Sequence, residues 1–368
     1  MNSNNCLICN NILTFPLFTD NIFISSDLEV IKQKINFFFC NLCGNLQKEI
    51  NKKYIKKISS IYKKYIGFKK YNNKDQTKVF DIESSKSRCE VIFNLIQKKI
   101  KRKIKFLDFG CSNGAMLYPM LGEKKIALYG TDIKNILDKK ITKSKNFKGF
   151  LNLNKILSYN EKFDIITLIH VFEHFIDPLN ELIKIKKLLK KNGRIYIQIP
   201  NYNENYYDLR IYDHAVHWNR LSLNHIFQKI GLKIEKIYTS IIDCEFTIVL
   251  KKEKTIQINI DIKKINFEKK NILNQLFKIN KIFKKLIETK KFSILGSSVA
   301  ATLIISKFKN KIKHVYDQDL NKIGNYHFNF LIHRIKKNSP EKIFLPFPKK
   351  RITNVKKNLT KYNLKFIN

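Results

Sequence analysis

Four of the seven cysteines form two pairs near the start of the chain. Cys6 and Cys9 make the first C-x2-C pair. Cys40 and Cys43 make the second, after a gap of 30 residues, and Gly44 follows at once, where a tight turn is expected. The two-residue gap lets both sulfurs of a pair face one ion, and two pairs supply the four thiolates of a closed tetrahedral zinc site. A redox pair beside an accidental one is the alternative. The pattern predicts one structural zinc ion per chain.

A turn with several small residues follows a strand-like apolar run, in the order Asp108, Gly110, Ser112 and Gly114. Open α/β sheets bind nucleoside cofactors where a strand ends and a glycine lets the backbone approach the ligand. The D-x-G-x-x-x-G spacing lacks the close glycine pair that a pyrophosphate needs, and its leading acid suits a cationic or polar ligand. Asp132, 24 residues after Asp108, ends the next strand-like run and could accept hydrogen bonds from ribose hydroxyls. We interpret the segment as a cofactor site; a tight turn without a ligand is the alternative.

The string His170-Val-Phe-Glu173-His174 has the H-x-x-E-H spacing of some zinc hydrolases. Such a zinc site needs the histidines and the glutamate on one face of a helix. Here the string ends an apolar, strand-like run, and Asp177-Pro178 then signals the start of a helix. We therefore predict a loop at the end of a strand rather than a metalloprotease site.

A second polar cluster, Tyr212-Asp213-His214, precedes His217 and Trp218. A histidine beside a carboxylate is a good general base, because the carboxylate can fix its tautomer and tune its pKa. We predict His214 as a catalytic base. A cluster that merely packs at the start of the following helix is the alternative.

These segments resemble known methyltransferases. Residues 106–115 resemble motif I of class I S-adenosylmethionine (SAM) methyltransferases, and residues 170–178 resemble the segment after the fourth strand of the same enzymes. The resemblance implies that SAM is the cofactor. It implies a SAM site built from the following residues: Asp108, Gly110, Ser112, Gly114, Asp132 and His170.

Residues 212–218 resemble the "YEHxxYF" segment of zinc-containing C-methyltransferases that act on nucleotide-linked deoxysugars, with Asp213 in place of the usual glutamate. The paired cysteines and the C-terminal third of the chain also resemble that three-domain family. The resemblance implies methyl transfer to a carbon next to the keto group of a nucleotide-activated deoxysugar, for surface-polysaccharide or secondary-metabolite sugars. It implies that Asp213 orients the base His214, and that Tyr212 or Tyr65 helps to hold the enolate.

The elements that must position these residues follow from the alternation of apolar, β-rich runs and helical segments after Ile104. Such alternation is typical of βαβ units and a parallel sheet covered on both faces. We expect two further strands, which form an antiparallel pair, near the end of this region. The expected helices are listed here: 46–70 in part, 84–101, 115–121, 178–190 and 299–308.

Three domains fit the length of 368 residues. Residues 1–83 would form a zinc-binding module with a Tyr-rich helical segment, and residues 84–252 the SAM-binding domain. Residues 253–368 would begin with a polar, Lys- and Asn-rich connecting segment, the polar crossing. A second strand, turn and helix pattern would follow it. The predicted fold class is α/β: a central class I methyltransferase Rossmann-like sheet, an N-terminal zinc module and a second Rossmann-like domain at the C-terminus.

The net charge is +41, from 71 basic and 30 acidic residues. The lysines are spread along the whole chain rather than clustered on one element, which disfavours nucleic acid as the partner. A negatively charged nucleotide sugar would still be attracted. The chain shows neither a membrane-spanning apolar run nor a secretory signal, so we expect no membrane insertion and a cytoplasmic location.

The predicted function is therefore SAM-dependent C-methylation of a nucleotide-activated keto-deoxysugar. Transfer to oxygen or nitrogen of another small molecule, or to RNA, is the alternative enzyme. A noncatalytic binding module is disfavoured, because motif I and Asp132 together indicate a working cofactor site.

Overall fold

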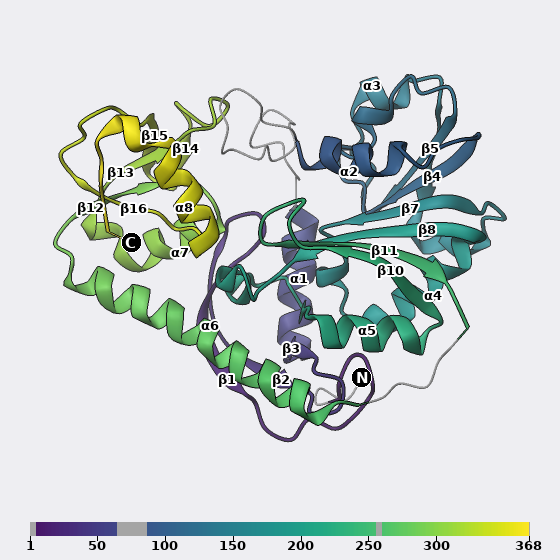
Figure 1. The fold of residues 1–368 in the computed structure, drawn as a ribbon, viewed down its shortest axis with the longest axis horizontal. Helices are drawn as coiled ribbons and strands as arrows, with labels where there is room; N and C mark the ends of the chain where they lie inside the picture. Colours follow the sequence, from purple (N-terminus) through teal and green to yellow (C-terminus); the bar gives the residue numbers. More distant parts are fainter. Residues whose placement is uncertain (1–4, 65–86, 255–259, 368) are drawn as a thin grey trace.

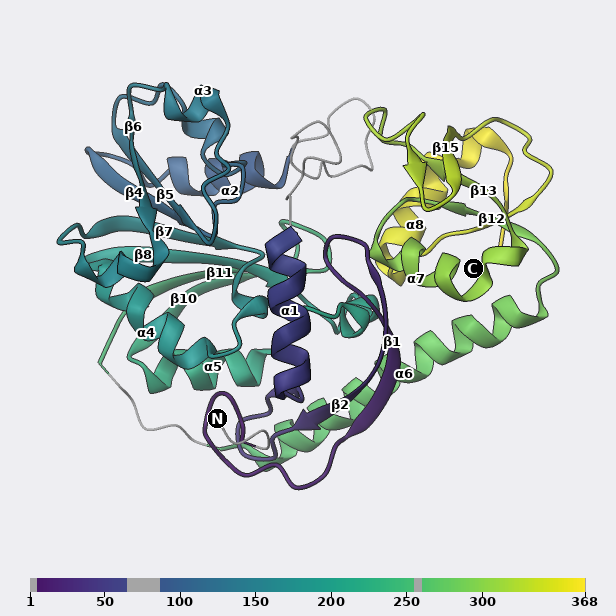
Figure 2. The same cartoon turned by 180° about the vertical axis from the view of Figure 1, so that it is seen from behind.

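Three β-sheets and one long helix organise the chain in a computed structural model, which describes residues 5–64, 87–254 and 260–367 (Figure 1). The middle sheet has seven strands, the N-terminal sheet four and the C-terminal sheet six. The middle and C-terminal sheets lie on opposite sides of the molecule in both views, with the N-terminal module between and below them (Figure 2).

The middle sheet has its first strand in a central position. From edge to edge its strands are β10 (Leu232–Tyr238), β11 (Glu245–Lys252), β8 (Leu189–Pro200), β7 (Phe163–Ile169), β4 (Ile104–Phe109), β5 (Ile126–Asp132) and β6 (Phe147–Asn152). Five neighbouring strands run parallel, in the order β6, β5, β4, β7 and β8. In contrast, β11 pairs antiparallel with both β8 and β10. This topology confirms the expected Rossmann-like sheet with an antiparallel pair at its end.

Helices cover both faces of the middle sheet. α4 (Pro178–Leu188) and α5 (Arg220–Lys229) pack in one hydrophobic core, and α2 (Arg88–Gln97) packs in another on the opposite face. The short α3 (Lys139–Thr142) lies beside β6. The apolar runs of the sequence therefore form strands because both of their faces are buried.

The N-terminal sheet contains β1 (Phe18–Ile24), β2 (Val30–Phe39) and β3 (Leu46–Lys48), all antiparallel. Its fourth strand, β9 (Val216–His217), comes from the segment that follows the middle sheet's fifth strand in sequence. Helix α1 (Lys52–Lys64) buries Tyr54 in the same core as Tyr212. The segment predicted to hold the base is thus part of the N-terminal sheet.

The C-terminal sheet is Rossmann-like as predicted, with a parallel centre. Its order is β14 (Tyr326–His327), β15 (Phe330–Arg334), β13 (Ile312–Asp317), β12 (Phe292–Leu295), β16 (Lys342–Phe344) and β17 (Lys365–Phe366). Helices α7 (Val299–Phe308) and α8 (Lys349–Asn358) accompany it. The division at 83 and 252 stays a proposal, and β9 crosses the first of these boundaries.

One predicted helix was wrong, and two elements were not predicted. The stretch 115–121 forms turns and a 3-10 helix, Tyr118–Met120, because Pro119 cannot donate a helical hydrogen bond. The stretch expected to be helical after Leu46 begins with β3, which completes the N-terminal sheet. The polar crossing contains the longest described helix, α6 (Ile262–Glu288). Its first half packs on the N-terminal module and its second half on the C-terminal domain.

Candidate active site

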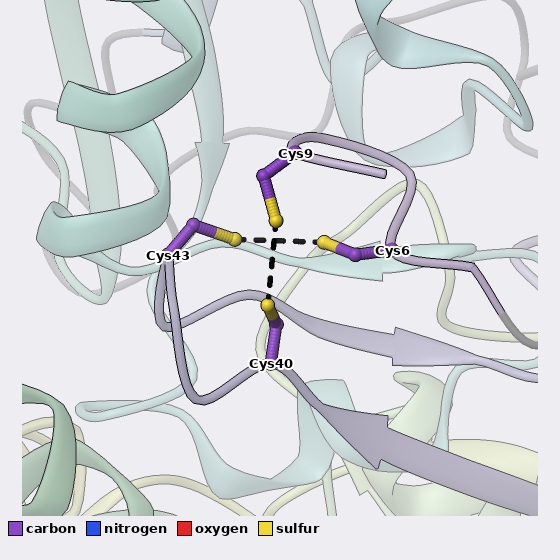
Figure 3. Close-up of side chains that lie close together, drawn as sticks. All are labelled: Cys6, Cys9, Cys40 and Cys43. Atoms are coloured by element: carbon purple, nitrogen blue, oxygen red, sulfur yellow. Dashed lines mark hydrogen bonds between the residues drawn. The ribbon is translucent and has the colours of Figure 1, made fainter. Parts of the chain in front are cut away.

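The four paired cysteines lie together, with their sulfurs directed at a common centre (Figure 3). All four Sγ atoms are within 4.8 Å of one another, and the Cys6–Cys43 and Cys9–Cys40 sulfurs are each 3.5 Å apart. Four sulfurs bound 2.3 Å from one zinc ion would be about 3.8 Å apart. Thiolates this close repel one another unless a cation lies between them. The geometry fits a tetrahedral zinc ion held by these four side chains.

Both cysteine pairs sit in the same kind of turn. The amide of Asn10 donates to the carbonyl of Cys6 (3.0 Å), and the amide of Gly44 donates to the carbonyl of Cys40 (2.9 Å). Asn10 and Gly44 both have positive φ, 66° and 70°, which asparagine and glycine adopt most readily. A Cβ on Gly44 would be 3.1 Å from the Cβ of Leu221 in α5. The predicted turn at Gly44 is confirmed, and this turn also packs against the middle sheet's helices.

The glycine loop after β4 needs its glycines. Gly110 and Gly114 have φ of +79° and +89°. A Cβ on Gly110 would lie 2.4 Å from Cγ2 of Val171, and one on Gly114 would lie 2.1 Å from Cδ1 of Ile141. The positive φ and these close contacts both favour glycine, which lets the loop pack tightly against Val171 and Ile141.

Two carboxylates face this loop from the ends of β4 and β5. The hydroxyl of Thr167 donates to Oδ1 of Asp108 (2.7 Å), and burial raises the pKa of Asp108 to about 7. Oδ2 of Asp132 accepts from the amide of Ser112 (2.7 Å), and its Oδ1 accepts from the amide of Ile133 (2.6 Å). Burial also raises the pKa of Asp132. The amide of Lys134 also bonds to this carboxylate. Asp132 therefore orders the loop, and one of the about four acceptor sites of a carboxylate is left for a ribose hydroxyl.

His170 directly follows β7 and has a φ of +55°, and its ring lies against two carboxylates. Nδ1 lies 3.0 Å from Oε1 of Glu173, and Nε2 lies 3.2 Å from Oε2 of Glu245. Burial and the nearby Arg88 lower the pKa of His170, but the two glutamates raise it more, to about 9. The motif makes a turn and a short 3-10 helix rather than a regular helix, in line with the predicted loop.

The predicted base, His214, lies in a buried cluster with a second histidine. Nδ1 of His214 is 2.7 Å from Oδ1 of Asp208, and Nδ1 of His217 is 2.7 Å from Oδ2 of the same carboxylate. Asp208 is 2% exposed, His214 4% and His217 0%. Burial alone would raise the pKa of Asp208, but the two imidazoles hold it well below its usual range.

The expectation that Asp213 orients His214 was wrong. Both oxygens of Asp213 accept hydrogen bonds from Ser26, one from its amide (2.8 Å) and one from its hydroxyl (2.5 Å). Ser26 follows β1, so Asp213 anchors the segment to the N-terminal sheet. The carbonyl of Asp213 accepts from Nδ1 of His174 (2.9 Å), and the His174 and His214 rings meet edge to face at 4.7 Å. Asp213 and His214 are adjacent in sequence, yet their side chains have different hydrogen-bond partners, Ser26 and Asp208.

A buried lysine completes the cluster. Lys48 in β3 is 0% exposed, and its Nζ donates to the carbonyls of Ile211 and His214 and lies 3.3 Å from Nε2 of His217. Burial lowers the pKa of Lys48 to about 7, although the charge of Asp208 opposes this shift. Burial, Lys48 and His214 likewise lower the pKa of His217, to about 4, although Asp208 opposes this.

Of the two predicted catalytic tyrosines, only Tyr212 lies in the part of the chain that the structure describes. Tyr212 is buried, and its hydroxyl donates to Oε1 of Gln33 (3.1 Å). The hydroxyl of Tyr54 donates to the carbonyl of Tyr212 (3.0 Å), so both rings pack beneath the base segment. Tyr65 lies outside the described residues.

Sequence reasoning missed Asp208 and Lys48. Asp208 carries a readable signal, because it is a carboxylate six residues before His214 and nine before His217. Lys48 carries none, since it is one of 71 basic residues and lies 166 positions from the carbonyl it contacts at His214.

Residues 82–237 match the family model described as "Methyltransferase domain". The chain is 30% identical over 128 residues to the tRNA U34 carboxymethyltransferase of Aliarcobacter butzleri (strain RM4018), covering 33% of this chain and 42% of that protein. It is 30% identical over 99 residues to the enzyme of the same name from Campylobacter hominis, covering 25% of this chain and 35% of that protein. The chain thus spans about two fifths or less of the length of these relatives.

Among solved structures, the PH0226 protein of Pyrococcus horikoshii OT3 matches 47% of this chain and 94% of that chain, with 19% identity and a TM-score of 0.36. A SAM dependent methyltransferase from Aquifex aeolicus matches 44% of this chain and 88% of that chain, with 18% identity and a TM-score of 0.36. The family match and the strand order define the middle part as a class I methyltransferase domain. Among the described residues, no helix combines the length and apolar character needed to cross a membrane.

Proposed function

We propose that the protein is a SAM-dependent methyltransferase whose acceptor binds between the carboxyl edge of the middle sheet and the N-terminal module. One observation carries the proposal: the loop after β7 joins the two halves of the site. His170 in this loop follows the strand beside the glycine loop, and His174 contacts both the backbone and the ring of the predicted base segment. A cofactor at the glycine loop would therefore lie near an acceptor at His214.

The residues assigned to SAM are Asp108, Gly110, Ser112, Gly114, Asp132 and His170. When bound there, SAM supplies an electrophilic methyl group on a cationic sulfur. The chain's own part is to place a nucleophile behind that methyl group in a dry cleft. Burial of His214 and of its carboxylate partner supports such a site, because water is excluded from around the base.

We propose further that the acceptor is a nucleotide-activated keto-deoxysugar methylated at carbon. A carbon nucleophile requires removal of a proton next to a carbonyl, and His214 is the candidate base for this step. Asp208, in contact with its Nδ1, would stabilise the imidazolium that forms. The four-cysteine site is closed and structural, so the proton transfer needs no ligand from it.

A second candidate acceptor is RNA, and the curated relatives favour it over the sugar. By their names, these relatives act on U34 of tRNA. Their similarity is confined to about a third of this chain, and the net charge of +41 suits a polyanionic partner. The buried base cluster favours a small acceptor, since His214 and Asp208 are at most 4% exposed.

The test is a methyl-transfer assay with labelled SAM, a panel of nucleotide-linked 4-keto sugars, and unmodified tRNA. Label in a keto sugar, with exchange of its α-hydrogen for deuterium in the presence of S-adenosylhomocysteine, supports the C-methyltransferase. Label in tRNA alone supports the RNA candidate instead. A His214→Ala variant should lose about 10²- to 10⁴-fold in sugar turnover while its SAM affinity stays unchanged. Unchanged turnover would remove His214 from the mechanism.

A further inference from the structure

Behind His214 the structure holds three buried polar groups in series, Asp208, His217 and Lys48. We propose that they form a positioning relay, which fixes neutral His214 in the tautomer with the proton on Nδ1 and the lone pair on Nε2. The proposal rests on the proposed function, because it specifies how the candidate base is held. None of the three need touch the acceptor.

Lys48 lies at the end of the cluster farthest from His214 along the hydrogen-bonded side chains. Its Nζ has three polar neighbours: the carbonyl oxygens of Ile211 and His214, and Nε2 of His217 at 3.3 Å. An ammonium group has three N–H donors and no acceptor, and carbonyl oxygens only accept. While Lys48 is an ammonium group, Nε2 of His217 is therefore the acceptor, which puts the proton of this neutral ring on Nδ1. The contact of Nδ1 with the carboxylate of Asp208 requires the same tautomer when Lys48 is neutral, because the carboxylate only accepts.

The carboxylate of Asp208 links the two imidazole rings. Oδ2 of Asp208 faces Nδ1 of His217, and Oδ1 faces Nδ1 of His214, both at 2.7 Å. An ionised carboxylate only accepts, so each oxygen takes one N–H. Neutral His214 is then protonated on Nδ1, which leaves Nε2 as its basic atom. With Asp208 2% exposed, water does not compete for these bonds.

The far side of His214 agrees with a base that becomes charged. A ring nitrogen of His214, a ring nitrogen of His174 and a carboxylate oxygen of Glu173 lie within 4.8 Å of one another. Nδ1 of His174 donates to the carbonyl of Asp213, so that ring is fixed as well. Glu173 is 1% exposed, and its Oε2 has no hydrogen-bond partner among the described residues. A carboxylate is thus available to stabilise the imidazolium when His214 takes up a proton.

The first experiment reads the tautomers directly by nitrogen NMR of protein labelled with ¹⁵N-histidine. The chain has eight histidines, and His214→Gln and His217→Gln variants assign the two signals. We expect both neutral rings to be protonated on Nδ1. Protonation of neutral His214 on Nε2 would overturn the relay, whether or not the protein methylates any tested acceptor.

The second experiment replaces Asp208 with asparagine, which keeps the shape but turns one acceptor into a donor. One of the two rings must then turn or change its tautomer. We expect α-hydrogen exchange of the keto sugar, with S-adenosylhomocysteine bound, to slow by about 10²- to 10⁴-fold while SAM affinity changes less than about twofold. Asp243→Asn is the matched control, because the carboxylate of Asp243 lies outside this cluster and pairs with Lys350 at 3.5 Å.

Lys48→Met provides an independent variant if Asp208→Asn does not fold. It removes the donor to Nε2 of His217 and leaves that nitrogen without this partner, so the Nε2 signal of His217 should shift, the ring should be held less firmly and exchange should slow. Exchange at the wild-type rate in either folded variant overturns the relay. So does a loss of SAM affinity equal to the loss of exchange, which would indicate a general structural role. Failure of the proposed function is a different result: His214→Ala would exchange at the wild-type rate while the NMR assignment still held.

Discussion

Replacing Gly110 with alanine should destabilise the cofactor loop. The structure allows the free-energy cost to be divided into two parts. The first part is backbone strain, because alanine at a φ of +79° costs about 1–2 kcal/mol. The second is overpacking against Val171, whose Cγ2 would be 2.4 Å from the new Cβ, and this costs typically 1–3 kcal/mol. Together they predict a loss of about 2–5 kcal/mol in unfolding free energy.

Gly122 provides the matched control. Its φ is +83°, nearly that of Gly110, but a Cβ there meets nothing within 4 Å. Gly122→Ala should therefore lose only the strain, about 1–2 kcal/mol, and keep its SAM affinity. Gly110→Ala should bind SAM at least about tenfold more weakly, which corresponds to ~1.4 kcal/mol.

The assay is urea denaturation followed by fluorescence, together with calorimetric titration of SAM. The chain has one tryptophan, Trp218, which is buried and stacked on Phe172 at 4.2 Å, so its emission reports on this part of the molecule. In a double-mutant cycle, Val171→Ala should relieve the overpacking part only, about 1–3 kcal/mol. Equal losses in Gly110→Ala and Gly122→Ala, or no relief from Val171→Ala, would refute the reasoning.

Three further predictions follow from the same contacts. Metal analysis should find one zinc ion per chain, and Cys40→Ser should destabilise the N-terminal module while SAM affinity changes little; zinc-free protein purified without a chelator would contradict this. Asp132→Ala should weaken SAM binding, and calorimetry showing wild-type affinity in a folded variant would remove Asp132 from the site. The glutamates around His170 outweigh its burial and raise its pKa from 6.5 to about 9. Its protonation therefore stabilises the fold fully below pH 6.5, and this contribution is lost as the pH rises through 9. The urea midpoint of unfolding should fall more between pH 6.5 and 9 in the wild type than in His170→Gln. If the midpoints of the two proteins changed equally with pH, protonation of His170 would not stabilise the fold.

The strands of the middle sheet could be predicted because burial on both faces leaves a continuous apolar run. The strand from Phe163 to Ile169 is an example, since every residue but the last is buried. The glycine loop was also predictable, since positive φ and close approach demand glycine at fixed places. These features depend on residues that are neighbours in sequence.

The helix α6 was missed although it carries a signal. Ile265, Ile272, Ile279 and Leu286 recur every seven residues, and all four are buried. Lysines and asparagines between them lower the mean hydropathy, so the apolar stripe is visible only at a spacing of two helical turns. A test of heptad spacing would have found it.

The partner of the base could not be predicted from neighbours. Asp213 is adjacent to His214, yet its carboxylate binds Ser26, and this contact spans 187 positions. Asp208 reaches His214 only because the 3-10 helix Tyr206–Arg210 turns the chain back. Side-chain partners in such a segment depend on the backbone path, which the residue pattern alone does not define.

The two-residue strand β9 has a consequence for anyone who wishes to divide or recombine this chain. Leu46, three residues after the last zinc-site cysteine, pairs with His217, and Gln47 pairs with Val216. A fragment cut out at residues 84–252 would keep the whole methyltransferase sheet but leave this strand without its neighbour and Asp208 without the buried Lys48. Such a fragment could retain its cofactor loop and lose the alignment of its base. Exchange of parts with other methyltransferases would have to move the first 64 residues and the segment 206–219 as one piece.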